Sequence, residues 1–62
     1  MNTGKILTVS GPVVDCGFET GQLPAIREAL HVTLHGEVRV MEVVQQLSAT
    51  RVRCVLLGAS EQ

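Results

Sequence analysis

The sequence predicts a small all-β domain, an antiparallel Greek-key barrel that is closed or nearly closed. Apolar and polar residues alternate along several short stretches, which is the two-residue period of strands with one buried face. Glycine, proline and small polar residues separate these stretches at short intervals. Hydrophobic residues make up 45% of the 62 residues, and valine is frequent among them, which suits a sheet.

Two strands are expected at the start of the chain. The first spans residues 5–10, where Ile6 breaks an otherwise regular alternation. Gly11-Pro12 then marks a sharp change of direction. A second strand follows over residues 13–18, with its apolar side chains at the even-numbered positions.

A short helical element is expected after the second strand. Pro24 stands where a helix can begin, because a first helical residue needs no free N–H. The apolar residues Leu23, Ile26 and Leu30 have near-helical spacing. The sequence therefore predicts one short helical turn at residues 24–29.

Three further strands are expected in the second half of the chain. They span residues 30–34, about 37–47 and 51–57, with tight turns between them. Within the long middle strand the apolar residues change phase, which predicts a β-bulge or strong bend near Met41 and Glu42. These strands and turns favour an antiparallel barrel or a partly open sheet, and the closest generic alternative is a five-stranded Greek-key barrel of the oligonucleotide-binding type.

Length and charge narrow the classes of function. A chain of 62 residues forms one domain of marginal stability. Its net charge of -1 comes from five basic and six acidic residues that are scattered, so neither nucleic acid nor an anionic membrane surface is an expected partner. No apolar run approaches the roughly 20 residues of a membrane span, and the first residues show no signal-peptide core. The sequence predicts a soluble protein that works in the compartment where it is made.

The residue patterns predict no catalytic, cofactor-binding or metal site in this segment. A phosphate-binding loop, Gly-x-x-x-x-Gly-Lys-Ser/Thr, is absent, so the segment itself is not expected to be an enzyme. His31 and His35 would lie about 13 Å apart along a strand, too far to share a metal ion. Cys16 and Cys54 each lie in an apolar strand pattern, which favours buried free thiols over a disulfide.

Five charged residues are candidates for an interface: Asp15, Glu37, Glu42, Arg51 and Arg53. Arg51 and Arg53 alternate with apolar residues, so both are expected on the outward face of the last strand. Asp15 lies opposite the apolar face of the second strand. It is expected either to pair with an arginine of a neighbouring strand or to remain a solvated carboxylate.

Several stretches resemble one known domain, the amino-terminal β-barrel domain of the β (catalytic) subunit of F-type ATP synthase. The resemblance covers nearly the whole chain, in order and with similar spacing. It rests on Gly4-Lys5-Ile6, Gly11-Pro12-Val13-Val14-Asp15, Gly21-Gln22-Leu23-Pro24-Ala25-Ile26 with Ala29-Leu30, Glu42-Val43-Val44-Gln45-Gln46-Leu47 and Arg51-Val52-Arg53-Cys54.

The resemblance implies a barrel of six strands, of which residues 1–62 would contain five. The turn before the sixth strand would begin at Ser60, where Glu61-Gln62 stands in place of the family's usual Asp-Gly. An isolated chain is therefore expected to have an open sheet edge and to self-associate through it.

The resemblance also implies an assembly role. Barrels of alternating α and β subunits would form a ring that holds the hexamer together, so α subunits and other subunits of the catalytic part are the expected partners. Arg51 and Arg53 would then form ion pairs with Glu37 or Glu42 of another subunit.

The parent subunit, by the same resemblance, would bind ATP or ADP with Mg and synthesise or hydrolyse ATP coupled to proton or sodium translocation. It would lie on the cytoplasmic side of the bacterial plasma membrane, peripheral to it. The alternative is a standalone β-barrel binding module without ATPase activity, although Phe18 is the only aromatic residue available for base stacking.

Overall fold

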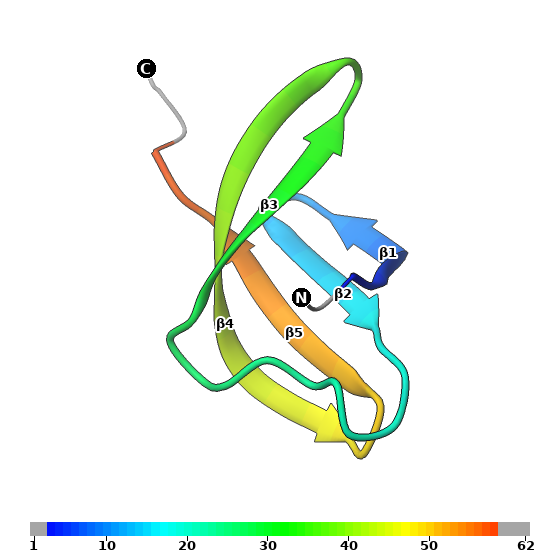
Figure 1. Cartoon of the computed structure of the whole chain (residues 1–62). Coiled ribbons are helices and arrows are strands. Elements are labelled where there is room, and N and C mark those ends of the chain that lie inside the picture. Colours follow the sequence, from blue (N-terminus) through cyan, green and yellow to red (C-terminus); the bar gives the residue numbers. More distant parts are fainter. Residues whose placement is uncertain (1–2, 59–62) are drawn as a thin grey trace.

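The chain folds into one strongly curved antiparallel sheet (Figure 1). The computed structural model describes residues 3–58. Its strands are β1 (Lys5–Ser10), β2 (Val13–Gly17), β3 (Ala29–Leu34), β4 (Glu37–Ser48) and β5 (Arg51–Leu56). All five expected strands are confirmed, and their bounds differ from the expected ones by a single residue at most.

The strand order contains one pairing that is not between consecutive strands. The sheet runs β1-β2-β5-β4-β3, so β2 pairs with β5 from the other end of the chain. The segment between β2 and β3 passes the ends of β5 and β4 to reach the far edge of the sheet (Figure 1). Strands β3, β4 and β5 with β2 beside β5 form the Greek key that the sequence predicts.

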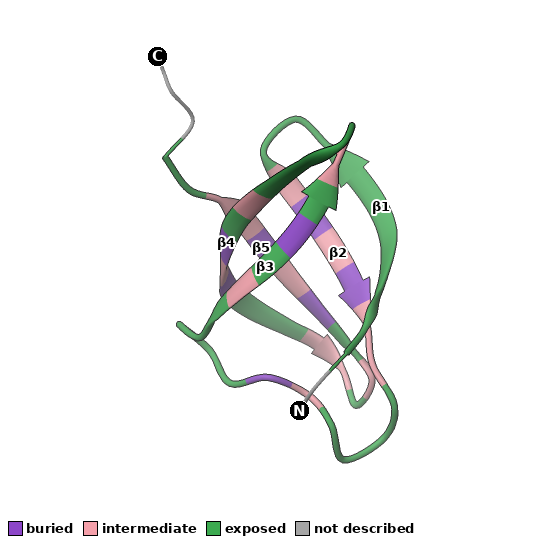
Figure 2. Ribbon diagram, turned by 45° about the horizontal axis from the view of Figure 1, so that its top comes forward, coloured by how far each residue is buried: buried purple, intermediate pink, exposed green. Residues whose placement is uncertain are grey.

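The core lies on the concave side of the sheet. Along β2 and β5 buried side chains alternate with half-buried or exposed ones, so one face of each strand is inside (Figure 2). Val14, Val43, Val52 and Cys54 have no exposed surface, and Cys16, Val32 and Met41 complete the buried set. Four of the five strands contribute to this core, whereas β1 is exposed along its whole length.

The helical turn expected at residues 24–29 is wrong. The segment is a single tight turn in which the Glu28 amide donates to the Ala25 carbonyl at 3.0 Å and Arg27 has a φ of 77°. The backbone then pairs with β4, since the Arg27 amide donates to the Val43 carbonyl at 2.7 Å and the Val43 amide donates to the Glu28 carbonyl at 3.0 Å. These sheet-like hydrogen bonds use the groups that a helix would need internally.

The bend expected near Met41 and Glu42 is misplaced. β4 pairs with β3 without irregularity from Glu37 to Glu42. Its register against β5 shifts further on, between Val43 and Gln45 and again between Gln46 and Ser48. No phase slip is needed at Met41, because Val38 and Val40 are exposed on the outer face of β4.

The sheet is an open barrel among the described residues. β1 and β3 are its two edges, and no pairing between them closes the circle in residues 3–58. The turn residues expected before a sixth strand, Ser60 to Gln62, lie outside the described residues. The architecture is therefore an all-β half-barrel of five antiparallel strands.

Candidate functional site

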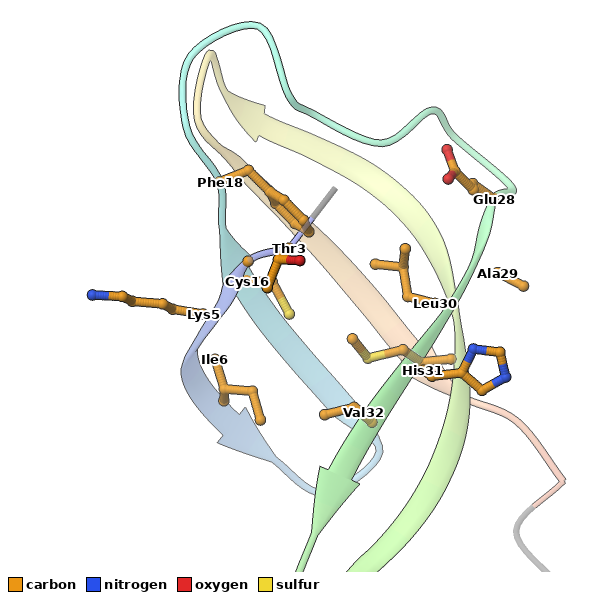
Figure 3. A pocket seen from close by; sticks show the side chains of 12 residues that line it. Thr3, Lys5, Ile6, Cys16, Phe18, Glu28, Ala29, Leu30, His31 and Val32 are labelled. Carbon is orange, nitrogen blue, oxygen red and sulfur yellow. The ribbon is translucent and has the colours of Figure 1, made fainter. Parts of the chain in front are cut away.

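A groove separates the two free edges of the sheet. It has a volume of about 590 Å³ and lies between β1 and β3 (Figure 3). Ile6, Phe18 and Leu30 extend into it, whereas Lys5 and His31 point away (Figure 3). Cys16, Val32 and Met41 also line the groove. Apolar side chains of the half-barrel core form its inner wall, and polar residues such as Thr3 and Glu28 also line it.

The strand directions at the groove suit one further strand. Because every neighbouring pair is antiparallel, alternate strands in the order β1-β2-β5-β4-β3 point the same way. The edge strands β1 and β3 are therefore parallel to each other. A single segment antiparallel to both would close the sheet with every pair antiparallel. The groove thus fits an extended chain segment.

The two cysteines lie on adjacent strands of the inner face. Cys16 pairs with Val52 and Cys54 with Val14, so the thiols are diagonal neighbours, and both are free. Burial raises the pKa of both thiols, and that of Cys54 reaches about 12. Protonated thiols are poor nucleophiles and poor metal ligands, so this pair belongs to the core.

An ion pair joins β2 and β5 on the outer face. Arg53 Nε donates to Asp15 Oδ1 at 2.9 Å, and Arg53 Nη2 donates to Asp15 Oδ2 at 3.0 Å. These hydrogen bonds hold the pKa of Asp15 below its ordinary value of 3.8, while burial opposes them. Of the two alternatives for Asp15, the structure shows pairing with an arginine of the neighbouring strand.

This ion pair belongs to a polar row that crosses the sheet. Thr8 in β1 pairs with Asp15 in β2, which pairs with Arg53 in β5, which pairs with Gln45 in β4. The Thr8 hydroxyl also lowers the pKa of Asp15. Since cross-strand neighbours project from the same face, four strands present polar side chains along one line.

The fold and the sequence agree with one family. The profile of the ATP synthase alpha/beta family, beta-barrel domain, matches residues 6–62. The chain belongs to this family. The match covers β2 to β5 completely and β1 from its second residue, and it includes the residues that form the Greek key and the ion pair.

The other candidate interface residues of this ATP synthase barrel domain lie apart from one another. Arg51 and Glu37 are exposed, and Glu42 is half-buried. Glu37 begins β4 at the hairpin with β3, whereas Arg51 begins β5 at the opposite end of the sheet. The structure brings only Asp15 and Arg53 into direct contact, and both belong to one chain.

The described residues of the ATP synthase barrel domain form no metal-ligand cluster. Within residues 3–58, no three His, Cys, Asp or Glu side chains cluster as metal ligands would. His31 lies in β3 and His35 in the turn that follows it. In the described part of the chain, no helix is long and apolar enough to cross a membrane.

Two features of the outer face were not expected from the sequence. Lys5 and Gly17 lie in one cross-strand row with Arg51, and this row borders a second hollow. No local pattern signals the row, because it depends on β2 lying between β1 and β5. Only the strand order could have revealed it.

Proposed function

We propose that this chain is the amino-terminal barrel of a β subunit of F-type ATP synthase and acts as an assembly domain. In this role the barrels of alternating α and β subunits form a ring and hold the hexamer together. The barrel contributes stability and geometry to the complex, and the chemistry takes place elsewhere in the parent subunit.

The assignment to the β subunit rests on the stretch Gly21-Gln22-Leu23-Pro24-Ala25-Ile26, which resembles the β subunit more closely than the α subunit. In the structure this stretch is the connection that passes from β2 to β3. The family match itself covers both subunits.

The outer surface supports an assembly role, and this is the observation that carries the proposal. Large apolar side chains project from it on β1 and β4, with exposed fractions of 48% for Leu7, 69% for Val38 and 44% for Val44. The charged row through Asp15 and Arg53 lies on the same side of the sheet. A surface with apolar and paired polar groups is typical of protein–protein contacts.

The open edges support the proposal that a sixth strand completes the barrel in the parent protein. That strand would follow residue 62 and enter the groove between β1 and β3. Without it, the edges β1 and β3 can pair with other molecules, which is the self-association expected for an isolated chain.

The proposed parent subunit binds ATP or ADP with Mg and couples catalysis to the movement of protons or sodium ions. It works at the inner face of a bacterial plasma membrane, attached through the other subunits. These properties belong to sequence outside this barrel.

The test is the intact mass and sequence of the native polypeptide that carries residues 11–26. The proposal expects a much longer polypeptide, with a further strand and a Gly-x-x-x-x-Gly-Lys-Ser/Thr loop beyond residue 62. A native polypeptide of 62 residues without partner subunits would refute it and favour a standalone module.

A further inference from the structure

A row of three residues crosses the outer face next to the ion pair. Gly17 in β2 pairs with Lys5 in β1 on one side and with Arg51 in β5 on the other. Cross-strand partners project from the same face of a sheet, so Lys5 and Arg51 flank a position without a side chain. Figure 3 shows Lys5 pointing away from the apolar groove, toward this outer face.

The missing side chain of Gly17 leaves a hollow between the two cations. The hollow has a volume of about 350 Å³, and Leu7 and Thr50 also line it. A Cβ at Gly17 would lie 3.3 Å from Leu7 Cδ1, so Leu7 borders the same space. The floor is therefore formed by the Gly17 backbone and the Leu7 side chain, and Lys5 and Arg51 bring positive charge to the walls.

Neither cation forms an ion pair within the described residues, although the charge of Arg51 also acts on Asp15. The nearby carboxylate of Asp15 is already paired, because each of its two oxygens accepts a hydrogen bond from the Arg53 guanidinium. Lys5 and Arg51 form no ion pair among residues 3–58. Glu19 is the single acidic residue at the rim of the hollow. Two positive charges facing one carboxylate leave an excess of positive charge.

We propose that the hollow between Lys5 and Arg51 receives a carboxylate side chain from the neighbouring barrel of the assembly. The inference rests on the proposed function for the identity of the neighbour, and it adds the residues and the chemistry of the contact. A glutamate or aspartate reaching over Gly17 would meet both cations while its methylene groups contact Leu7. This arrangement gives a charge-assisted contact with an apolar base.

The first experiment is zero-length carbodiimide cross-linking of the assembled complex, followed by peptide mass spectrometry. Lys5 is the only lysine among residues 1–62, so a cross-linked peptide from the start of the barrel identifies its side-chain amine. The proposal expects a bond between the Lys5 amine and a carboxylate of the neighbouring subunit. The Arg51→Lys variant should form a cross-link to the same carboxylate.

The matched control is the Arg27→Lys variant, which places an amine on an exposed residue of the turn before β3, outside the row. This amine should not react with the carboxylate that reacts with Lys5. Cross-links from Lys5 only to Glu19 of its own chain would overturn the proposal. An intact complex with no cross-link from Lys5 or from the Arg51→Lys variant would also overturn it.

A second experiment measures how strongly the subunits assemble. Lys5→Gln combined with Arg51→Gln should weaken assembly by about ten-fold and reduce its dependence on salt, with the fold unchanged by circular dichroism. Equal assembly of this variant and the wild type would refute the carboxylate contact. If the wild-type polypeptide forms no complex with other subunits, the proposed function itself fails, which is a different result.

Discussion

Arg53 donates one hydrogen bond to each carboxylate oxygen of Asp15, although the two residues are 38 positions apart in the chain. They are direct partners in the β2–β5 pairing, the one strand contact that joins the start of the chain to its end. A bidentate pair has a defined geometry, so it favours this register over a slip by one residue.

The Asp15→Asn variant should lose stability at neutral pH but not in acid. The folded pKa of Asp15 lies below the value of 3.8, so the ionised carboxylate stabilises the fold above that pH. This contribution is lost as the pH falls through the folded pKa. In urea unfolding, the difference between wild type and Asp15→Asn should be constant above about pH 5 and shrink below 3.8.

The control for this series is Glu19→Gln, a change at an exposed carboxylate outside the ion pair. Its effect should be small at every pH. An Asp15→Asn difference that stays the same down to the lowest pH would contradict the role of the ion pair.

Two valines of β4 should respond very differently to truncation. Val43 has no exposed surface, so Val43→Ala removes buried methyl groups and leaves a cavity, at a cost of about 2–3 kcal/mol. Val38 is 69% exposed, and Val38→Ala should change the free energy of unfolding by less than about 0.5 kcal/mol. Chemical denaturation of both variants measures the contrast. Equal losses of unfolding free energy in the two variants would contradict the assignment of Val43 to the core and of Val38 to the outer face.

The thiols should resist alkylation in the folded protein. Burial raises the pKa of Cys16, and it raises that of Cys54 to about 12, so both remain protonated at mildly alkaline pH. Iodoacetamide at pH 8 should modify them slowly before denaturant is added and rapidly afterwards, as followed by intact mass. Rapid modification of Cys54 in the folded state would mean that the β2–β5 face opens.

Gly4 should tolerate alanine less well than Gly17. A Cβ at Gly4 would lie 2.6 Å from the Gly17 carbonyl oxygen and 2.7 Å from the Phe18 ring, so the backbone just before β1 must move. A Cβ at Gly17 meets only the end of the Leu7 side chain, at 3.3 Å. Thermal unfolding should show a loss of about 1–3 kcal/mol for Gly4→Ala and a smaller one for Gly17→Ala. A larger loss for Gly17→Ala than for Gly4→Ala would contradict the close contact of the residue before β1 with Gly17 and Phe18.

The strands could be predicted from the sequence because each has a local signal. Alternation marks β2 and β5, and His35-Gly36 marks the hairpin between β3 and β4, where both residues have positive φ, 50° and 81°. The short strands and tight turns also favoured a Greek-key class of sheet, but the pairing of β2 with β5 was not predicted.

The errors arose where tertiary contacts decide the conformation. The spacing of Leu23, Ile26 and Leu30 is helical, but Arg27 and the next residue pair with Val43 instead, and periodicity carries no information about that partner. The first register shift in β4 lies after Val43, because Val43 pairs with Cys54 of β5 and the next pair is Gln45 with Arg53. A local pattern cannot locate a shift that depends on two strands.

For the site residues too, local patterns could be predicted from the sequence, whereas contacts between strands could not. The sequence placed Asp15 and Arg53 on outward faces, but it could not choose between a solvated carboxylate and an ion pair without the β2–β5 register. For the same reason it gave no indication of the row from Lys5 across Gly17 to Arg51.

The most direct test of the assembly role is native mass spectrometry of the complex formed by the full polypeptide with Val52→Asp. Val52 has no exposed surface, so a carboxylate there should unfold the barrel. Ala49→Asp, in the exposed β4–β5 turn, is the control. The account predicts that Val52→Asp releases free subunits that still bind nucleotide, while Ala49→Asp assembles normally. A fully assembled complex containing the Val52→Asp chain would contradict the claim that this barrel holds the subunits together.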